Sequence, residues 1–344
     1  MDGGLRESSG VGGFTARGLV DIATVALAAV LWMGPPLWSE AKNSCVQGDS
    51  SAAFSTLLGL PPAQAVQSPL EAEIREGISE KDFARAAELV KRMEPSADYW
   101  LWNGALLLQQ GKTFKSIRSL EESARIRDTS SVETLLAVGY LLLNQRVLMQ
   151  DALRAALQFD PRNAIALHLQ GRLDFMTANY ERAISDFGAV LAIEPNDYLS
   201  WYYLGLSEWR LARNDSAHNH LLRAVEVLNC HHWDFSQAPL TLGKLEFDSG
   251  VFDPAFTHVN LAVEMAQRGA DPTENLDQLS EALVLRGKIE TRLGHQHDAE
   301  RDWQQAVQLD PRQESAWYLL SQLYQHQGRT VEAANALREF QENQ

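Results

Sequence analysis

Apolar residues recur at steps of three and four along most of this chain, and this spacing places them on one face of a helix. The pattern is clear in residues 163–194. Apolar positions there fall in two runs, 164–175 and 183–191, and the short segment Thr177-Ala178-Asn179 separates them. The pattern therefore predicts two helices joined by a tight turn.

The helical pair returns along the chain with a fixed period. Several pairs of identical residues are 34 positions apart: Pro161 and Pro195, Gly171 and Gly205, Ala183 and Ala217, and Ala299 and Ala333. A period of this length is typical of stacked supersecondary units that bury their apolar faces against their neighbours. Prolines close several units, because proline cannot continue a finished helix but is tolerated in the first turn of the next one. The chain is therefore predicted to be an all-α repeat protein.

The repeated residues resemble the pattern of the tetratricopeptide repeat family. One copy consists of Trp201, Leu204, Gly205, Ala217, Leu221 and Ala224. Similar sets surround Gly104, Gly171, Gly287 and Trp317, and weaker ones surround Ala137 and Gly243. The resemblance implies a right-handed superhelical α-solenoid of helix-turn-helix repeats over residues 68–344, with about eight helix pairs counting an atypical first one. It also implies that Gly171 and Ala183 are small because two helices approach closely there.

The spacing of the repeat glycines widens in the second half of the chain. It grows from 34 residues to 38 between Gly205 and Gly243, and to 44 between Gly243 and Gly287. Extra residues therefore enter near 230–236 and 268–278, and we expect irregular loops at both places. Such insertions contact partners in some solenoids and are tolerated surface elaborations in others.

The composition agrees with a folded helical array and narrows the classes of possible partner. Hydrophobic residues make up 45% of the chain and charged residues 22%, which are ordinary values for a globular protein. The formal net charge of -15 disfavours nonspecific contact with nucleic acid or anionic lipid, and the lack of any basic run further disfavours nucleic acid. We therefore predict no nucleic-acid partner.

The N-terminal region, residues 1–41, has the features of a signal peptide or a membrane anchor. An apolar run from Ile22 to Met33 follows Arg6 and Arg17, and Ser39-Glu40-Ala41 offers small residues for cleavage. The span 18–38 is long enough to cross a bilayer as a retained anchor, although Asp21 lies within it. If Arg6 and Arg17 stay inside, both interpretations place the repeats outside the cytoplasm, as a periplasmic, secreted or anchored protein. Residues 42–67 are rich in Ser, Ala, Gln and Gly and predict a flexible linker.

Histidines and cysteines form one cluster that could carry chemistry: His218, His220, Cys230, His231, His232 and Asp234. Zinc needs three or four ligands that converge in a tetrahedron. Histidines two apart on a helix point to different sides, so we predict no metal site and no cofactor. The chain also lacks the hydrolase and phosphate-binding motifs, so we predict no enzyme. Cys45 is the only other cysteine, and the sequence leaves its pairing with Cys230 open.

The family resemblance implies that the first helix of each repeat lines a concave groove. Candidate partner-binding residues are then His168, Arg172, Tyr202, Leu206, Trp209, Arg210, Lys244 and Lys288. Aromatic and arginine side chains are common binding anchors, and the cations suit an acidic or carboxylate-bearing peptide. The competing interpretation is that Tyr202 and Trp209 only pack between repeats. The set lacks the paired Lys and Asn of repeat proteins that grip chaperone tails, so that subgroup is not favoured.

These features predict a non-catalytic scaffold that binds a protein or peptide partner outside the cytoplasm. Two alternatives stay open: a structural subunit of an envelope complex that is anchored by the N-terminal segment, and a metal-dependent enzyme that uses the histidine cluster. The sequence determines neither the identity of the partner nor the oligomeric state.

Overall fold

The computed structural model describes residues 68–80, 82–268 and 276–343. The predicted export segment, residues 1–41, and the predicted linker, residues 42–67, lie outside the described residues. The chain divides into two compact units, residues 1–173 and 174–344. All regular structure in the described residues is helical, which confirms the prediction of an all-α fold.

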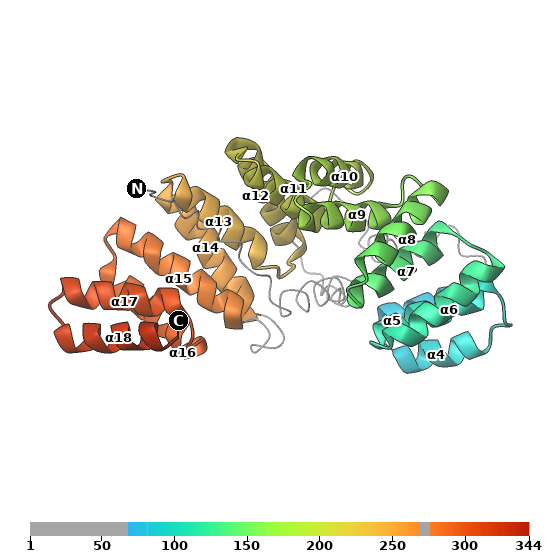
Figure 1. Ribbon diagram of the computed structural model, residues 1–344, viewed down its shortest axis with the longest axis horizontal. Coiled ribbons are helices and arrows are strands. Elements are labelled where there is room, and N and C mark those ends of the chain that lie inside the picture. Colours follow the sequence, from blue (N-terminus) through green and yellow to red (C-terminus); the bar gives the residue numbers. More distant parts are fainter. Residues whose placement is uncertain (1–67, 81, 269–275, 344) are drawn as a thin grey trace, which may run out of the picture. The chain divides into compact units, whose positions relative to one another are not determined.

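Unit 1 is a stack of helices in which each helix packs against the next (Figure 1). Its helices are α3 (Pro69–Ser79), α4 (Phe83–Lys91), α5 (Ala97–Gln109), α6 (Thr113–Ile126), α7 (Ser130–Leu142) and α8 (Arg146–Phe159). Helix α9 (Ala164–Met176) begins in unit 1, and its last residues belong to unit 2. Side-chain caps begin several helices: Ser68, Asp82, Ser96 and Thr129 each accept a hydrogen bond from a backbone N–H in the first turn.

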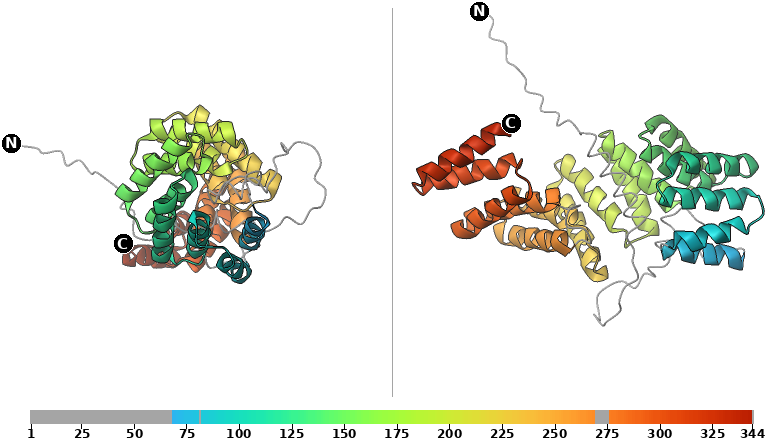
Figure 2. Two further views of the ribbon diagram at one scale, coloured as in Figure 1. Left: turned by 90° about the vertical axis from the view of Figure 1, so that its right-hand side faces the viewer. Right: turned by 90° about the horizontal axis from the view of Figure 1, so that it is seen from below.

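Unit 2 continues the same alternation of first and second helices. Its helices are α10 (Tyr180–Ile193), α11 (Tyr198–Arg210), α12 (Asn214–His231), α13 (Gln237–Asp248), α14 (Phe252–Arg268), α15 (Leu276–Leu293), α16 (Gln296–Leu309), α17 (Glu314–His326) and α18 (Thr330–Glu342). Figure 2 shows the last pair, α17 and α18, lying side by side in red. Among the described residues, no helix combines the length and the apolar composition needed to cross a bilayer.

The turns inside the helix pairs share one backbone conformation. A residue with positive φ follows the end of the first helix, as at Gly111 (φ 68°) and Asn144 (φ 55°) in unit 1 and Gly294 (φ 89°) in unit 2. Glycine enters this left-handed conformation at little cost, and asparagine tolerates it better than most residues. Each turn therefore reverses the chain within a few residues and lays the second helix against the first.

Pro161 precedes α9 and Pro195 precedes α11, so both prolines lie within the connecting turns. One expectation about the connections needs correction. The segment near residue 230 is not an irregular loop throughout, because α12 runs on to His231. Asn229 stands where Pro195 stands one period earlier, so nothing stops the helix there, and the extra residues lengthen α12. The second insertion lies partly outside the described residues, between α14 and α15.

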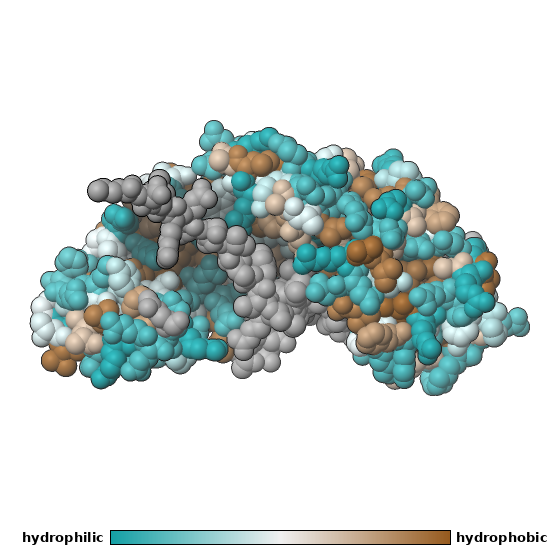
Figure 3. Space-filling model, in the orientation of Figure 1, coloured by the Kyte–Doolittle hydropathy of each residue, from teal (hydrophilic) through white to brown (hydrophobic). Residues whose placement is uncertain are grey.

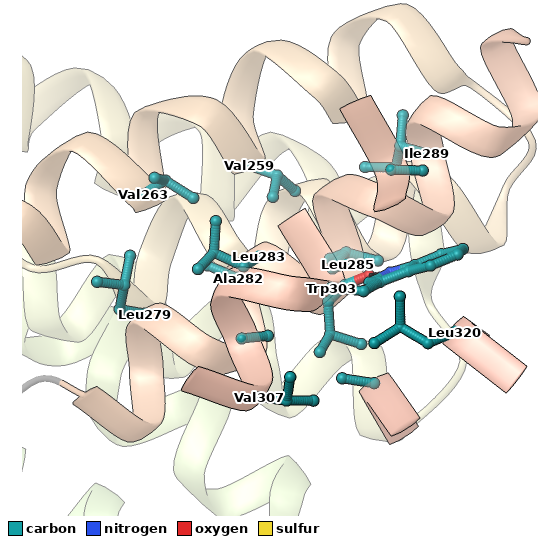
Figure 4. Close-up of a cluster of buried hydrophobic side chains, with 14 of the residues drawn as sticks. Val259, Val263, Leu279, Ala282, Leu283, Leu285, Ile289, Trp303, Val307 and Leu320 are labelled. Atoms are coloured by element: carbon teal, nitrogen blue, oxygen red, sulfur yellow. Dashed lines mark hydrogen bonds between the residues drawn. The ribbon is translucent and has the colours of Figure 1, made fainter. Parts of the chain in front are cut away.

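Each unit has its own apolar core between the helices. In unit 2, α14, α15, α16 and α17 meet around Trp303, Leu283 and Ile289, which are all buried (Figure 4). Small residues allow the close approach. A Cβ atom on Gly243 would lie 2.5 Å from Val259 and 3.1 Å from the carbonyl oxygen of Ala255, which belongs to the facing backbone. The repeat glycine is therefore required by packing, as the sequence pattern predicts.

Candidate functional site

The predicted groove residues lie on the first helices of the repeats. His168 and Arg172 belong to the part of α9 in unit 1. The other six lie in unit 2: Tyr202, Leu206, Trp209 and Arg210 on α11, Lys244 on α13, and Lys288 on α15. Arg172, Leu206, Lys244 and Lys288 each follow the repeat glycine directly, so they hold equivalent positions in their helices.

Two of the candidates are buried. Arg172 is 5% exposed and Tyr202 is 9% exposed. The ring of Tyr202 packs edge-on against Phe235 and Tyr203, and its hydroxyl shares a hydrogen bond with Thr241. Burial raises the pKa of Tyr202, so its hydroxyl stays protonated. Tyr202 thus packs with the following repeat in the way that the competing interpretation describes, and its role in binding stays a prediction.

Three cations of unit 2 reach solvent. Arg210 and Lys244 are exposed, and Lys288 is half-buried. In the part of the chain that the structure describes, none of the three forms an ion pair. Their charges are therefore available to a ligand on three successive first helices, α11, α13 and α15. His168, Leu206 and Trp209 are partly exposed.

A row of buried acids in unit 2 was not anticipated from the sequence. Four successive first helices carry an acidic residue three positions after the repeat glycine: Asp174, Glu208, Glu246 and Glu290. All four are buried. Each has a titratable residue twelve positions further along, on the second helix of its pair: Asp186, His220, His258 and Asp302. This i, i+12 relation is the signal by which the row could have been found.

Histidines hold the two middle acids. His220 Nδ1 lies 2.6 Å from Glu208 Oε2, and the His220 ring stacks on Trp201. His258 Nδ1 lies 2.8 Å from Glu246 Oε2, and His218 Nε2 lies 2.9 Å from Glu246 Oε1. One carboxylate therefore joins α12, α13 and α14. These contacts also explain why His218 and His220 do not converge, since they face different first helices.

The two outer acids each face a second acid. Asp174 and Asp186 share a hydrogen bond, and burial together with the charge of Asp174 raises the pKa of Asp186 to about 6. Burial raises the pKa of Glu290 to about 7, with a further contribution from Asp302. Glu290 Oε2 is buried and has no hydrogen-bond partner. A carboxyl group in such surroundings favours its neutral form.

Arg286 neutralises Asp302. Its Nε and Nη2 atoms donate to the two carboxylate oxygens of Asp302 at 2.6 and 2.7 Å, and its Nη1 donates to Asn260 Oδ1 at 2.8 Å. The forked pair between Arg286 and Asp302 is the geometry in which arginine binds carboxylates most strongly. It connects α14, α15 and α16 through side chains that are largely buried.

We expect replacement of Glu290 by glutamine to change the pH dependence of stability. The pKa of Glu290 in the folded protein, about 7, lies above its ordinary value of 4.5. Protonation of Glu290 therefore favours the folded state, and its contribution to the free energy of unfolding falls as the pH rises from about 4.5 to about 7. Glutamine removes this contribution, so the thermal midpoint of Glu290→Gln, relative to the wild type, should rise between pH 5 and pH 8.

The measurement is thermal unfolding at both pH values, followed by circular dichroism. Glu281→Gln, an exposed change on the same helix, serves as the control and should show no such trend. A difference between Glu290→Gln and the wild type that stays constant across this pH range would contradict the assignment.

The histidine cluster does not form a metal centre among the described residues. His231 stacks on Trp233 with ring centroids 4.4 Å apart. Burial lowers the pKa of His231, and the charge of the nearby His232 lowers it further. Cys230 is disulfide-bonded, and Cys45 lies outside the described residues, so the question of their pairing stays open. A shallow cavity of about 370 Å³ in unit 1 is lined by Gln150, Arg154, Leu157, Gln158 and Gln170, a set without acidic, histidine or cysteine side chains.

Comparison with known proteins agrees with the repeat pattern. Residues 284–344 match the family model described as tetratricopeptide repeat. Anaphase-promoting complex subunit 3 of Schizosaccharomyces pombe is 29% identical over 93 residues, which is 27% of this chain and 14% of that protein. The match therefore covers about a seventh of the length of this relative.

Solved structures share the fold. PilF of Pseudomonas aeruginosa is 19% identical with a TM-score of 0.54, and the match covers 64% of this chain and 94% of that one. The type IV pilus biogenesis factor PilW is 17% identical with a TM-score of 0.54, covering 66% and 100%. The APC/C hetero-tetramer Cut9-Hcn1 is 15% identical with a TM-score of 0.56, covering 79% and 50%. At these identities the likeness shows the fold alone.

Proposed function

We propose a binding function for this chain, which is a tetratricopeptide repeat protein: it is a non-catalytic scaffold that holds a protein or peptide partner on the first helices of its repeats. The observation that carries the proposal is the row of cations Arg210, Lys244 and Lys288 on α11, α13 and α15. Each helix of the row adds one positive charge without an ion pair in the described residues. A ligand that spans successive repeats would meet all three.

The chemistry of the row favours an acidic or carboxylate-bearing partner. The chain has a formal net charge of -15, whereas Arg210, Lys244 and Lys288 form no ion pair with an acidic residue within the described residues. Arginine and lysine bind carboxylates by charge-assisted hydrogen bonds, which are stronger than neutral ones. The partly exposed Leu206 and Trp209 on α11 supply apolar contact area beside Arg210.

The proposed location is outside the cytoplasm. Its support is the sequence of residues 1–41, with the apolar run from Ile22 to Met33 and the small residues Ser39 and Ala41. An intact-mass measurement on the protein from its native host decides between a cleaved signal and a retained anchor. Loss of about the first 41 residues would indicate cleavage, and the full mass would indicate an anchor.

We expect charge reversal at the exposed cations to abolish binding of acidic peptides. The experiment screens a displayed library of random peptides with the wild type and with Arg210→Glu/Lys244→Glu. The wild type should enrich acidic sequences and lose them as the salt concentration rises, because exposed charges are screened. The variant should not enrich them.

The control has the same change of charge on second helices. Arg223→Glu/Arg301→Glu alters the partly exposed Arg223 of α12 and the exposed Arg301 of α16, whose short-range ion pairs contribute little to stability. Circular dichroism checks that both variants keep their helix content. Equal enrichment of acidic peptides by the wild type and by Arg210→Glu/Lys244→Glu would reject the first helices as the binding surface.

A further inference from the structure

Large apolar side chains protrude from unit 1 where α6 and α8 begin. Phe114 and Val147 are each 72% exposed, and Leu148 is 45% exposed. Phe114 is the second residue of α6 and Val147 is the second residue of α8, so they hold equivalent positions in consecutive repeats. In the face shown in Figure 3, hydrophobic residues gather over the helices of unit 1, at the right of the view.

The same two helix starts carry positive charge and no negative charge. Segments 110–118 and 143–150 together contain Lys112, Lys115, Arg118 and Arg146, and neither contains an acidic residue. All four cations are exposed, and none forms an ion pair within the described residues. Further along the same helices the arginines are paired: Arg125 with Glu122, and Arg154 with Asp151.

The fold of unit 1 brings the two helix starts to one edge. Gly111 and Asn144 form equivalent turns, α5 packs against α6, α6 against α7, and α7 against α8. Consecutive pairs are therefore stacked in the same direction, and both turns lie at the same edge. We call residues 112–118 and 146–148 at this edge the α6/α8 start surface.

The last repeat offers a contrast at the same helix position. Val331 is the second residue of α18 and is 74% exposed. Its neighbour Arg329 is paired with Glu300 and Glu332. An exposed apolar residue at this helix position therefore does not always lie beside cations without ion pairs. Such cations, among the described residues, distinguish the start surface of unit 1 from the start of α18.

We propose that the α6/α8 start surface docks on an anionic membrane. Cations near such a membrane are attracted by its surface potential, and protruding apolar side chains enter the boundary between headgroups and acyl chains. Phe114, Val147 and Leu148 lie at turn ends, so they can enter a fluid interface that needs no matching pocket. A protein partner would instead need acidic groups placed opposite four separate cations. This contact is independent of the first-helix binding surface and of residues 1–67.

The test uses the full chain and vesicles of phosphatidylglycerol and phosphatidylcholine, with pure phosphatidylcholine as the neutral comparison. We expect binding to the anionic vesicles that weakens with salt. Each cation near the membrane contributes about a factor of five, so Lys115→Gln/Arg118→Gln should weaken partitioning roughly 25-fold. Phe114→Ser/Val147→Ser should weaken partitioning onto the anionic vesicles by a factor of similar size.

Two matched controls keep the test specific. Arg125→Gln/Arg154→Gln removes two charges from the same helices outside the surface, and Val331→Ser removes the equivalent apolar residue of α18; both should bind as the wild type does. Residues 1–67 are present in every variant, so their contribution is common to all. Hydrogen exchange locates the contact, and we expect slower exchange in segments 110–118 and 143–150 on anionic vesicles.

Three results would overturn the proposal. The first is equal vesicle binding by the wild type and both surface variants. The second is unchanged hydrogen exchange in both segments on the vesicles. The third is that the two surface variants lose binding to an acidic protein but keep vesicle binding, which would assign the surface to that protein.

Discussion

Replacing Trp303 by alanine is expected to lower the free energy of unfolding by about 3–5 kcal/mol, the usual cost of removing a large buried aromatic side chain. Trp303 is 3% exposed and lies among the apolar side chains of α14, α15, α16 and α17 (Figure 4). Its indole N–H donates to the carbonyl oxygen of Val284 at 3.1 Å. A Cβ atom on Gly287 would lie 2.4 Å from the indole nitrogen, so this glycine makes the space that the ring fills. Alanine would leave a cavity against a backbone that cannot easily close it.

The measurement is urea unfolding followed by circular dichroism, with free energies from linear extrapolation. Trp317→Ala is the matched control, since Trp317 also donates its indole N–H to a carbonyl oxygen, that of Pro311, but is partly exposed. We expect its cost to be less than half that of Trp303→Ala. Equal costs for the two variants would show that burial at Trp303 does not dominate the packing of this repeat.

The sequence was sufficient to predict the helices and the close approaches between them. The runs 164–175 and 183–191 correspond to α9 and α10, and Thr177-Ala178-Asn179 to the turn between them. These predictions succeed because periodicity, small residues and turns are local signals that repeat. Where one local signal changed, the prediction failed: Asn229 replaces the proline of earlier repeats, and α12 continues past it.

The buried acids could not be read from local pattern alone. Tyr140 and Tyr324 hold the equivalent position in other repeats, where the aromatic ring packs in an apolar core. Glu246 at that position gives no sign of burial until His218 and His258 are known to face it from two helices. The exposure of the candidate groove residues is equally difficult to predict from the local pattern. Tyr202 is covered by Phe235, a residue of the following connection, and only the tertiary structure reveals this contact.

Arg286 occupies a position that is leucine in the neighbouring repeats, at Leu204, Leu242 and Leu320. The substitution of charge for an apolar residue is accommodated because Asp302 lies opposite on α16 and accepts two hydrogen bonds. The carboxylate of Asp302 is 5% exposed. The attraction inside a buried pair is offset by the loss of hydration of both ions, so such a pair adds little net stability, whereas loss of one partner is costly.

Arg286→Leu is therefore expected to lower the free energy of unfolding at pH 8 by about 3–5 kcal/mol, because Asp302 would be left buried without its cation and beside Glu290. The loss should shrink as the pH falls toward 5, since the neighbouring Glu290, whose pKa is about 7, becomes protonated and no longer repels the Asp302 carboxylate. The leucine itself fits, as the neighbouring repeats show. The double variant Arg286→Leu/Asp302→Ala should recover most of the loss, to within about 1–2 kcal/mol of the wild type.

Urea unfolding of the wild type, both single variants and the double variant gives the coupling energy of the pair. Recovery in the double variant would show that the pair compensates its own burial, whereas an equal loss in Arg286→Leu and the double variant would show that the arginine stabilises α15 by contacts other than its pair with Asp302.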